Sequence, residues 1–175
     1  MIMSGTSSGG LFSALLKQGE SLQQDLVFNE PGKYSGQSVI RVPANGPISP
    51  GPAMLEVTSL SSKWSFEYTQ EVSGTGKSVP FEFSSSGDAI SPFLNLSTGE
   101  YTVTAEKEDI IGHFALKLMP VDGSIYTLFT NIGDNGVEFD GTFDFEIMKK
   151  GEYGNQPGVW MFDVDAPGEW TVSIK

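Results

Sequence analysis

Apolar and polar residues alternate along most of this chain, and this period of two constrains its fold more than any other feature. The segments 64–70, 100–106 and 169–174 each place apolar side chains at every second position. Successive side chains of a β-strand point to opposite faces of a sheet, so such segments bury one face. About a dozen segments of this kind, separated by turns rich in Gly, Pro, Asn, Asp and Ser, predict an all-β, antiparallel β-sandwich of the jelly-roll type.

The same alternation predicts which face of each strand is buried. Aromatic and aliphatic residues share one parity in most segments, and a register slip of one residue would bury acidic side chains such as Asp144 and Asp163 instead. Strand pairing should therefore be strongly specified. The residues expected in the core are Trp64, Val79, Phe81, Phe83, Tyr101, Val103, Ala105, Phe114, Leu116, Leu118, Phe143, Phe145, Ile147, Trp160, Phe162, Val164, Trp170, Val172 and Ile174.

Composition limits the chemistry that holds the chain together. The chain contains no cysteine, which excludes disulfide bonds, thiol nucleophiles and Cys-ligated metal centres. Its 12 Phe, 5 Tyr and 3 Trp supply large apolar side chains for burial. With 175 residues, the chain is long enough for one large β domain or two small ones.

Acidic residues dominate the second part of the chain. The net charge is −12, and residues 78–175 carry sixteen acidic and five basic side chains. Such a surface repels phosphate backbones and anionic lipid headgroups, so nucleic acid and bare membrane are poor partners. No apolar run reaches the ~20 residues that a membrane-spanning helix needs. We expect a protein or glycan surface as the partner, and no direct membrane insertion.

Two pairs of segments resemble each other and predict a partial internal repeat. The segment 26–42 aligns with 128–147, because both run from an apolar strand end through Asn and Gly to a second strand. The segment 52–68 aligns with 158–174, and their tryptophans coincide once one residue is inserted. Only the last four strands of the longer region have a counterpart upstream.

This repeat suggests three regions. Residues 1–21 begin with a Ser- and Gly-rich stretch, and Leu11–Leu16 has the only helix-like spacing, so we expect a flexible terminus with one short helical turn. Residues 22–72 would form a partial, four-stranded repeat, and residues 73–175 a complete sandwich. An isolated four-stranded sheet leaves an apolar face bare, so we expect both repeats to pack as one unit.

Four segments in the second half of the chain have a familiar order: "SGTGKSV" (73–79), "LNLSTGEYTVTAE" (94–106), "HFALKLMPVDGSIYTLFTNIG" (113–133) and "GVWMFDVDAPGEWTVSI" (158–174). This order resembles repeated β-sandwich domains of bacterial secreted and envelope proteins, of the pre-peptidase C-terminal type. The resemblance implies an accessory, noncatalytic domain that is often extracellular and sometimes binds calcium or glycans. The closing strand pair of such domains corresponds here to Asp163, Val164, Ala166, Gly168, Trp170, Val172 and Ile174.

Few residues form a catalytic pattern. His113 is the only histidine, it has the parity opposite to Phe114 and Leu116, and no G-x-S-x-G motif presents a serine to it. The many acidic residues leave open a hydrolase that uses paired carboxylates, although spacing alone nominates no pair. We expect that the protein is not an enzyme.

The acidic stretch "GDNGVEFDGTFDFE" is the strongest candidate for a cation site, because it holds five acids within thirteen residues and hard oxygen ligands suit Ca²⁺. If the strands at 142–148 and 159–165 pair as a hairpin, Asp144 and Asp163 meet on the outer face. Like charges opposite each other destabilise the pairing unless a cation binds. A solvated acidic face without metal is the alternative. The candidate calcium ligands are Asp134, Glu138, Asp140, Asp144 and Asp163.

Exposed aromatic side chains are the usual platform for glycans. Tyr34, Tyr126 and Tyr153 lie at turns or strand ends and are candidate ligand-binding residues, with ordinary edge packing as the alternative. We expect a noncatalytic binding or scaffolding module of a bacterial surface or secreted assembly, located outside the cell or in its envelope. A calcium-assisted carbohydrate-binding module is the alternative. A bare edge strand or the segment Leu11–Leu16 would permit homo-oligomers.

Overall fold

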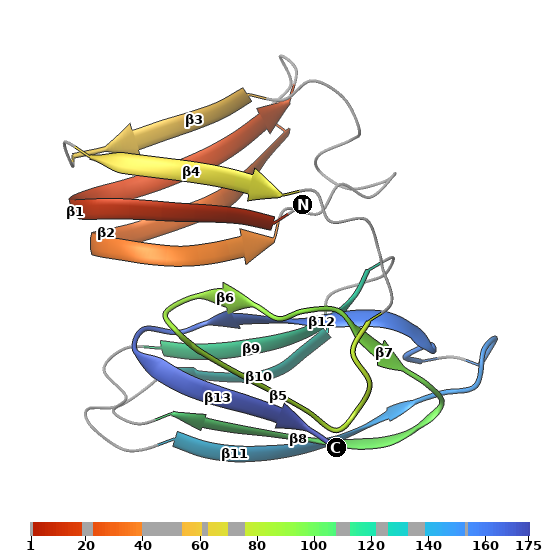
Figure 1. Cartoon of the computed structure of the whole chain (residues 1–175). Helices are drawn as coiled ribbons and strands as arrows, with labels where there is room; N and C mark the ends of the chain where they lie inside the picture. The colour runs from red at the N-terminus through yellow and green to blue at the C-terminus, as the bar shows by residue number, and fades with distance from the viewer. Residues whose placement is uncertain are drawn as a thin grey trace. The chain divides into compact units, whose positions relative to one another are not determined.

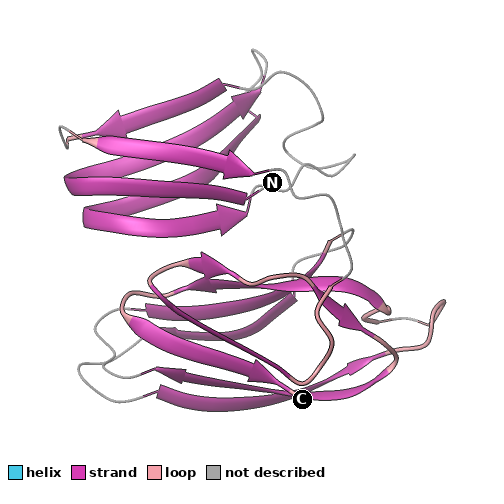
Figure 2. Cartoon of the chain, in the orientation of Figure 1, coloured by secondary structure: helices cyan, strands magenta, loops and turns pink. Residues whose placement is uncertain are grey.

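The computed structural model describes residues 2–18, 23–39, 54–60, 63–69, 76–107, 113–121, 126–132, 139–152 and 154–175. Within these residues every regular element is a β-strand and no helix is present that could cross a membrane, as Figure 2 shows. The predicted all-β, antiparallel sandwich is confirmed. The strands are β1 (Ile2–Gln18), β2 (Gln23–Val39), β3 (Met54–Ser59), β4 (Trp64–Thr69), β5 (Phe81–Ser86), β6 (Ala89–Ile90), β7 (Leu94–Leu96), β8 (Gly99–Lys107), β9 (His113–Pro120), β10 (Tyr126–Ile132), β11 (Phe139–Ile147), β12 (Gly158–Asp165) and β13 (Glu169–Ile174).

The chain divides into two compact units, Met1–Glu71 and Val72–Lys175, which we call unit 1 and unit 2. In Figure 1 unit 1 holds the red to yellow strands and unit 2 the green to blue strands. The sequence placed this division after residue 72 and assigned residues 1–21 to a separate terminus. The expectation that both parts pack as one unit stays a prediction, as does the internal repeat.

Unit 1 is built on the 17-residue strand β1. β2 pairs with β1 along its length, β4 pairs with Ile2–Ser7, and β3 pairs with Phe12–Lys17 (Figure 1). The expected flexible terminus with a helical turn at Leu11–Leu16 is therefore wrong. Its leucines lie on both faces of this strand, because Leu16 is buried in the core whereas Leu11 and Leu15 have the opposite parity and are exposed or half-buried. The parity of the buried side chains changes earlier, where the register shifts between Ser8 and Leu11.

Glycine permits this irregularity. Gly9 and Gly10 have φ angles of 139° and 79°, a region that other residues rarely adopt. Before them the buried side chains are at odd positions, such as Met3, and after them at even positions, such as Leu16. Met3 and Leu16 belong to the same apolar cluster, so the two ends of β1 face one core.

Among the described residues, the apolar core of unit 1 is more deeply buried on β1 and β2 than on β3 and β4. Its buried residues Met3, Ala14, Leu16 and Tyr34 come from β1 and β2. The apolar residues that β3 and β4 contribute, Leu55, Val57 and Phe66, are only partly buried. Trp64 is 50% exposed, so its expected place in a core is wrong. The reason is that β4 pairs with β1 by one edge and, among the described residues, pairs with no strand by the other.

Unit 2 is a sandwich of two sheets. Sheet B has the order β10-β9-β12-β6 with β7 also beside β12, and sheet C has the order β11-β8-β13-β5. Side chains from both sheets form one apolar cluster, which includes the predicted core positions of β9, β12 and β13 and, from β8, Val103 and Ala105. Val79, Phe81, Phe83 and Tyr101 pack against this cluster and are partly buried. The buried members are Ala89, Leu94, Leu96, Val103, Ala105, Phe114, Leu116, Leu118, Phe145, Ile147, Trp160, Phe162, Val164, Ala166, Trp170, Val172 and Ile174.

The break between β6 and β7 is bridged by a side chain. β12 pairs first with β6 and then with β7, and Ser91 lies in the interruption. The Ser91 N–H donates to the Phe162 carbonyl at 2.9 Å, and the Phe162 N–H donates to Ser91 Oγ at 2.8 Å. Ser91 Oγ in turn donates to the Pro92 carbonyl at 2.9 Å. The hydroxyl therefore satisfies a buried backbone donor where strand pairing is interrupted.

The outer faces of the two sheets differ. On sheet B, Ala115, Met119 and Met161 have the parity opposite to the sandwich core and are nevertheless buried. On sheet C the residues of this parity are polar and mostly exposed. Sheet C therefore presents the polar sheet face of unit 2.

Candidate binding surface

We define the outer face of sheet C by the side chains that alternate with its core residues. Strand pairing places them in rows across β11, β8, β13 and β5. Six carboxylates on this face are exposed, whereas Lys175 is the basic side chain among its described members. The described members are Glu82, Ser84, Ser86, Glu100, Thr102, Thr104, Glu106, Thr142, Asp144, Glu146, Glu169, Thr171, Ser173 and Lys175.

Hydroxyl groups connect neighbouring strands across this face. Thr102 Oγ1 donates to Asp144 Oδ1 at 2.7 Å, and the hydroxyls of Ser84 and Thr171 share a bond of 2.9 Å. The Thr102 N–H donates to the Lys175 carbonyl at 2.9 Å, and the Lys175 N–H donates to the Thr102 carbonyl at 3.0 Å. These bonds place the last residue of the sequence beside Thr102.

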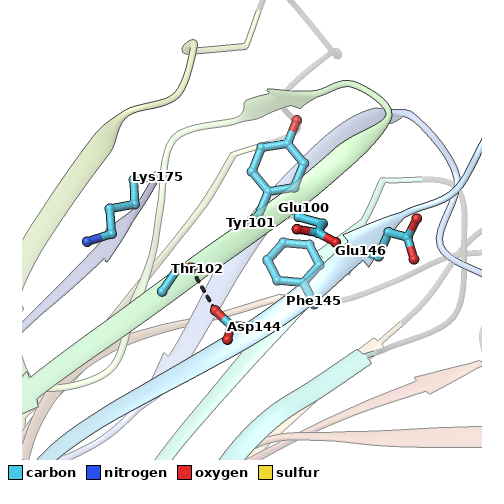
Figure 3. A pocket seen from close by; sticks show the side chains of 7 residues that line it. All are labelled: Glu100, Tyr101, Thr102, Asp144, Phe145, Glu146 and Lys175. Carbon is cyan, nitrogen blue, oxygen red and sulfur yellow. Dashed lines mark hydrogen bonds between the residues drawn. The ribbon is translucent and has the colours of Figure 1, made fainter.

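One end of the face is hollowed. An open hollow of about 780 Å³ is lined by Glu100, Tyr101, Thr102, Asp144, Phe145, Glu146 and Lys175. Figure 3 shows that their side chains come from β8 and β11 and from the chain end that follows β13. The Tyr101 and Phe145 rings stack with their centroids 5.5 Å apart and an interplanar angle of 22°. Tyr101 and Phe145 have the parity of the sandwich core, and Phe145 is buried there, so the charged groups at the hollow are three carboxylates and one ammonium group.

Two of these carboxylates face each other across the strands. Glu100 of β8 and Glu146 of β11 are direct partners in the antiparallel register, and both are exposed. Like charges at directly opposite positions destabilise strand pairing, and solvent screens exposed charges in part. Sequence reasoning did not nominate Glu100 or Lys175, because nothing in the sequence indicates that positions 100, 146 and 175 become neighbours.

The predicted calcium ligands are not brought together in the described part of the chain. Asp144 lies on β11 of sheet C and Asp163 on β12 of sheet B. The hairpin on which the meeting of Asp144 and Asp163 was conditional does not form, because β11 pairs with β8 and β12 pairs with β9. The connection between them passes from one sheet of the sandwich to the other. Asp163 Oδ2 instead lies 3.6 Å from Lys117 Nζ on the neighbouring strand.

The other candidate ligands cannot be placed in a site. Asp134 and Glu138 lie outside the described residues, and Asp140 is described only as a backbone position of β11. Among the described residues no group of three His, Cys, Asp or Glu side chains has an arrangement that could hold a metal ion.

The three candidate tyrosines do not form a common platform in the described structure. Tyr34 is only 8% exposed and belongs to the core of unit 1, so its expected role at the surface is wrong. It lies within the long strand β2 and not at a turn, and strand alternation directs it inward. Tyr126 begins β10 but its side chain is not described, and Tyr153 lies outside the described residues.

His113 lies beside a carboxylate, as a catalytic relay of serine, histidine and acid would require. Its Nε2 contacts Asp165 Oδ1, which comes from the neighbouring β12. The side chains are 43% and 42% exposed, so this contact lies at the surface and is open to solvent. A catalytic relay additionally needs a nucleophile held at the imidazole, and the hydrogen bonds found for His113 do not supply one. The expectation that the protein is not an enzyme stays a prediction, with a hydrolase that uses paired carboxylates as the alternative.

Comparisons with known proteins add little to this description. No protein-family model and no curated protein matches the sequence. The chain is similar to a solved structure of the infectious bursal disease virus VP2 subviral particle, with 14% sequence identity and a TM-score of 0.27, over 99% of this chain and 54% of that chain. The chain is also similar to a solved structure of the Gx strain of infectious bursal disease virus, with 15% sequence identity and a TM-score of 0.27. This similarity covers 99% of this chain and 54% of that chain. The chain spans about half the length of these structures, and a likeness this weak carries no argument about fold or function.

Proposed function

We propose that the protein is a noncatalytic binding or scaffolding module of a bacterial surface or secreted assembly, and that it binds through the outer face of sheet C. The observation that carries this proposal is the arrangement of exposed carboxylates and hydroxyls over four paired strands. A rigid sheet holds these groups in place, so a partner can meet many of them without ordering loops first.

The charge of the face supports a cationic partner. Six exposed carboxylates and one lysine attract a surface rich in Lys or Arg and repel an anionic one. Serine and threonine hydroxyls between the acids both donate and accept hydrogen bonds. A basic segment or face of another protein fits this chemistry.

Binding of the full chain to immobilised poly-L-lysine tests the proposal, with poly-L-glutamate as the control polymer. The double variant Glu100→Gln/Glu146→Gln should weaken binding to poly-L-lysine, and added salt should weaken it further. The control variant Glu67→Gln/Glu152→Gln removes the same charge from exposed positions outside the face. Equal weakening by both variants would show that net charge alone drives binding, and the proposal for this face would then be wrong.

Calcium-assisted glycan binding is the second candidate function. The direct opposition of the two carboxylates Glu100 and Glu146 favours it, because a divalent cation between them would offset their repulsion. Calorimetric titration of the full chain with CaCl₂, with MgCl₂ as the control, tests the cation step, and a glycan array with and without Ca²⁺ tests the ligand. Absence of both Ca²⁺ binding and a Ca²⁺-dependent thermal shift would contradict this candidate.

A further inference from the structure

We infer that one edge of β4, which pairs with no strand in the described part of the chain, is a self-association surface, on which the β4 strand of a second copy of this chain pairs antiparallel about a two-fold axis. This inference concerns unit 1 and goes beyond the binding function proposed for sheet C.

The first observation is an incompletely covered apolar face. Trp64, Phe66 and Tyr68 share one parity of β4, and Phe66 packs against the core of unit 1. Trp64 is 50% exposed and Tyr68 is 72% exposed, although both lie on this core-facing parity. The Trp64 and Phe66 rings contact each other with centroids 5.5 Å apart. An additional strand beside β4 would extend this face and cover the two exposed rings.

The second observation is an edge with little protection against pairing. β4 pairs with Ile2–Ser7 of β1 by one edge, and in the described part of the chain no strand pairs with the other edge. Edge strands that avoid association usually carry proline, a bulge or several charges. Trp64–Thr69 contains no proline, its pairing with β1 has no register shift, and Glu67 is its one charged residue.

The sequence of β4 is self-complementary, which selects a second copy as the occupant. In an antiparallel pair centred on Phe66, Trp64 lies opposite Tyr68 of the other copy and Ser65 lies opposite Glu67. Aromatic residues then face aromatic residues, and no like charges face each other. A symmetric pair of this kind is the usual geometry of a homodimer interface.

Net charge also restricts where two copies can meet. Residues 72–175 contain sixteen acidic and six basic side chains, a net charge of −10, whereas residues 1–71 contain six acidic and four basic ones, a net charge of −2. Two acidic surfaces of unit 2 repel each other, but two copies of unit 1 approach with little electrostatic cost. Of the two units, unit 1 is therefore the one suited to self-association.

Sedimentation equilibrium of the full chain over a wide concentration range tests the inference. We expect a reversible monomer–dimer equilibrium that Tyr68→Lys shifts to monomer. The matched control is Met54→Lys, which adds the same charge at a side chain that is 61% exposed on β3. A chain that stays monomeric at every concentration, or a dimer that Tyr68→Lys leaves intact, would overturn the inference.

A second pair of variants tests the register itself. Ser65→Glu places glutamate opposite Glu67 of the other copy twice and should weaken dimerisation roughly tenfold relative to Ser65→Lys, which places opposite charges there. Both variants remove the same exposed hydrogen bond between the hydroxyls of Ser65 and Thr6, so that loss cancels in the comparison. Circular dichroism verifies that both variants fold. Equal dimer affinities for the two would contradict the antiparallel register.

Discussion

The hydroxyl of Ser91 is the most informative single group to remove from unit 2. Ser91 is 3% exposed, and the hydroxyl accepts a hydrogen bond from the Phe162 N–H at 2.8 Å. Phe162 is fully buried, so water cannot easily replace the lost acceptor in the variant Ser91→Ala. The variant therefore leaves a buried backbone donor without this partner, while its change in side-chain volume is small.

The expected cost follows from this geometry. An unsatisfied buried donor lowers the free energy of unfolding by about 1–3 kcal/mol. For a domain of about 100 residues, such as Val72–Lys175, each kcal/mol lowers Tm by about 4–8 °C. Ser91→Ala should therefore lower the Tm of unit 2 by roughly 5–20 °C.

Tryptophan fluorescence during urea or thermal unfolding measures this change. Trp160 and Trp170 are buried in unit 2, so their red shift reports its unfolding, and a Trp64→Phe background removes the half-exposed tryptophan of unit 1. Ser84→Ala is the matched control, because its hydroxyl bonds to Thr171 on the exposed outer face of sheet C. If Ser91→Ala destabilises unit 2 no more than Ser84→Ala does, the assigned role of the buried hydroxyl is wrong.

Three further substitutions in unit 2 have defined outcomes in the same unfolding assay. Gly76→Ala should destabilise the unit by about 1–3 kcal/mol, because a Cβ there would lie 2.7 Å from the Leu94 carbonyl carbon; an unchanged midpoint would contradict this close approach. Phe162→Ala should cost about 3–5 kcal/mol by opening a cavity at a fully buried site, and a loss below about 1 kcal/mol would show that the sheets collapse around it. Trp170→Phe should lower the free energy of unfolding by about 1–3 kcal/mol, because it removes the hydrogen bond from Nε1 to the Gly87 carbonyl at 2.9 Å and some buried volume. An unchanged free energy of unfolding would show that this hydrogen bond contributes little.

The order of the amino acids is enough to predict a layered β structure and the buried face of most strands. In β8, Val103 and Ala105 are buried while Glu106 is exposed. In β13, Trp170 and Val172 are buried while Glu169 is exposed. These outcomes were predictable because side-chain direction in a strand follows from local backbone geometry, and burial of apolar area then selects the face.

Which strands are neighbours, and therefore which residues form the candidate binding surface, became clear from the three-dimensional structure. The alternation of apolar and polar residues in a strand is the same whichever strand pairs with it. It therefore could not show that Glu100 lies opposite Glu146, or that the backbones of Lys175 and Thr102 exchange hydrogen bonds. It also could not separate a helical turn at Leu11–Leu16 from a strand whose buried parity changes at two glycines. Partner choice depends on contacts between residues far apart in the chain, whereas parity depends on adjacent residues alone.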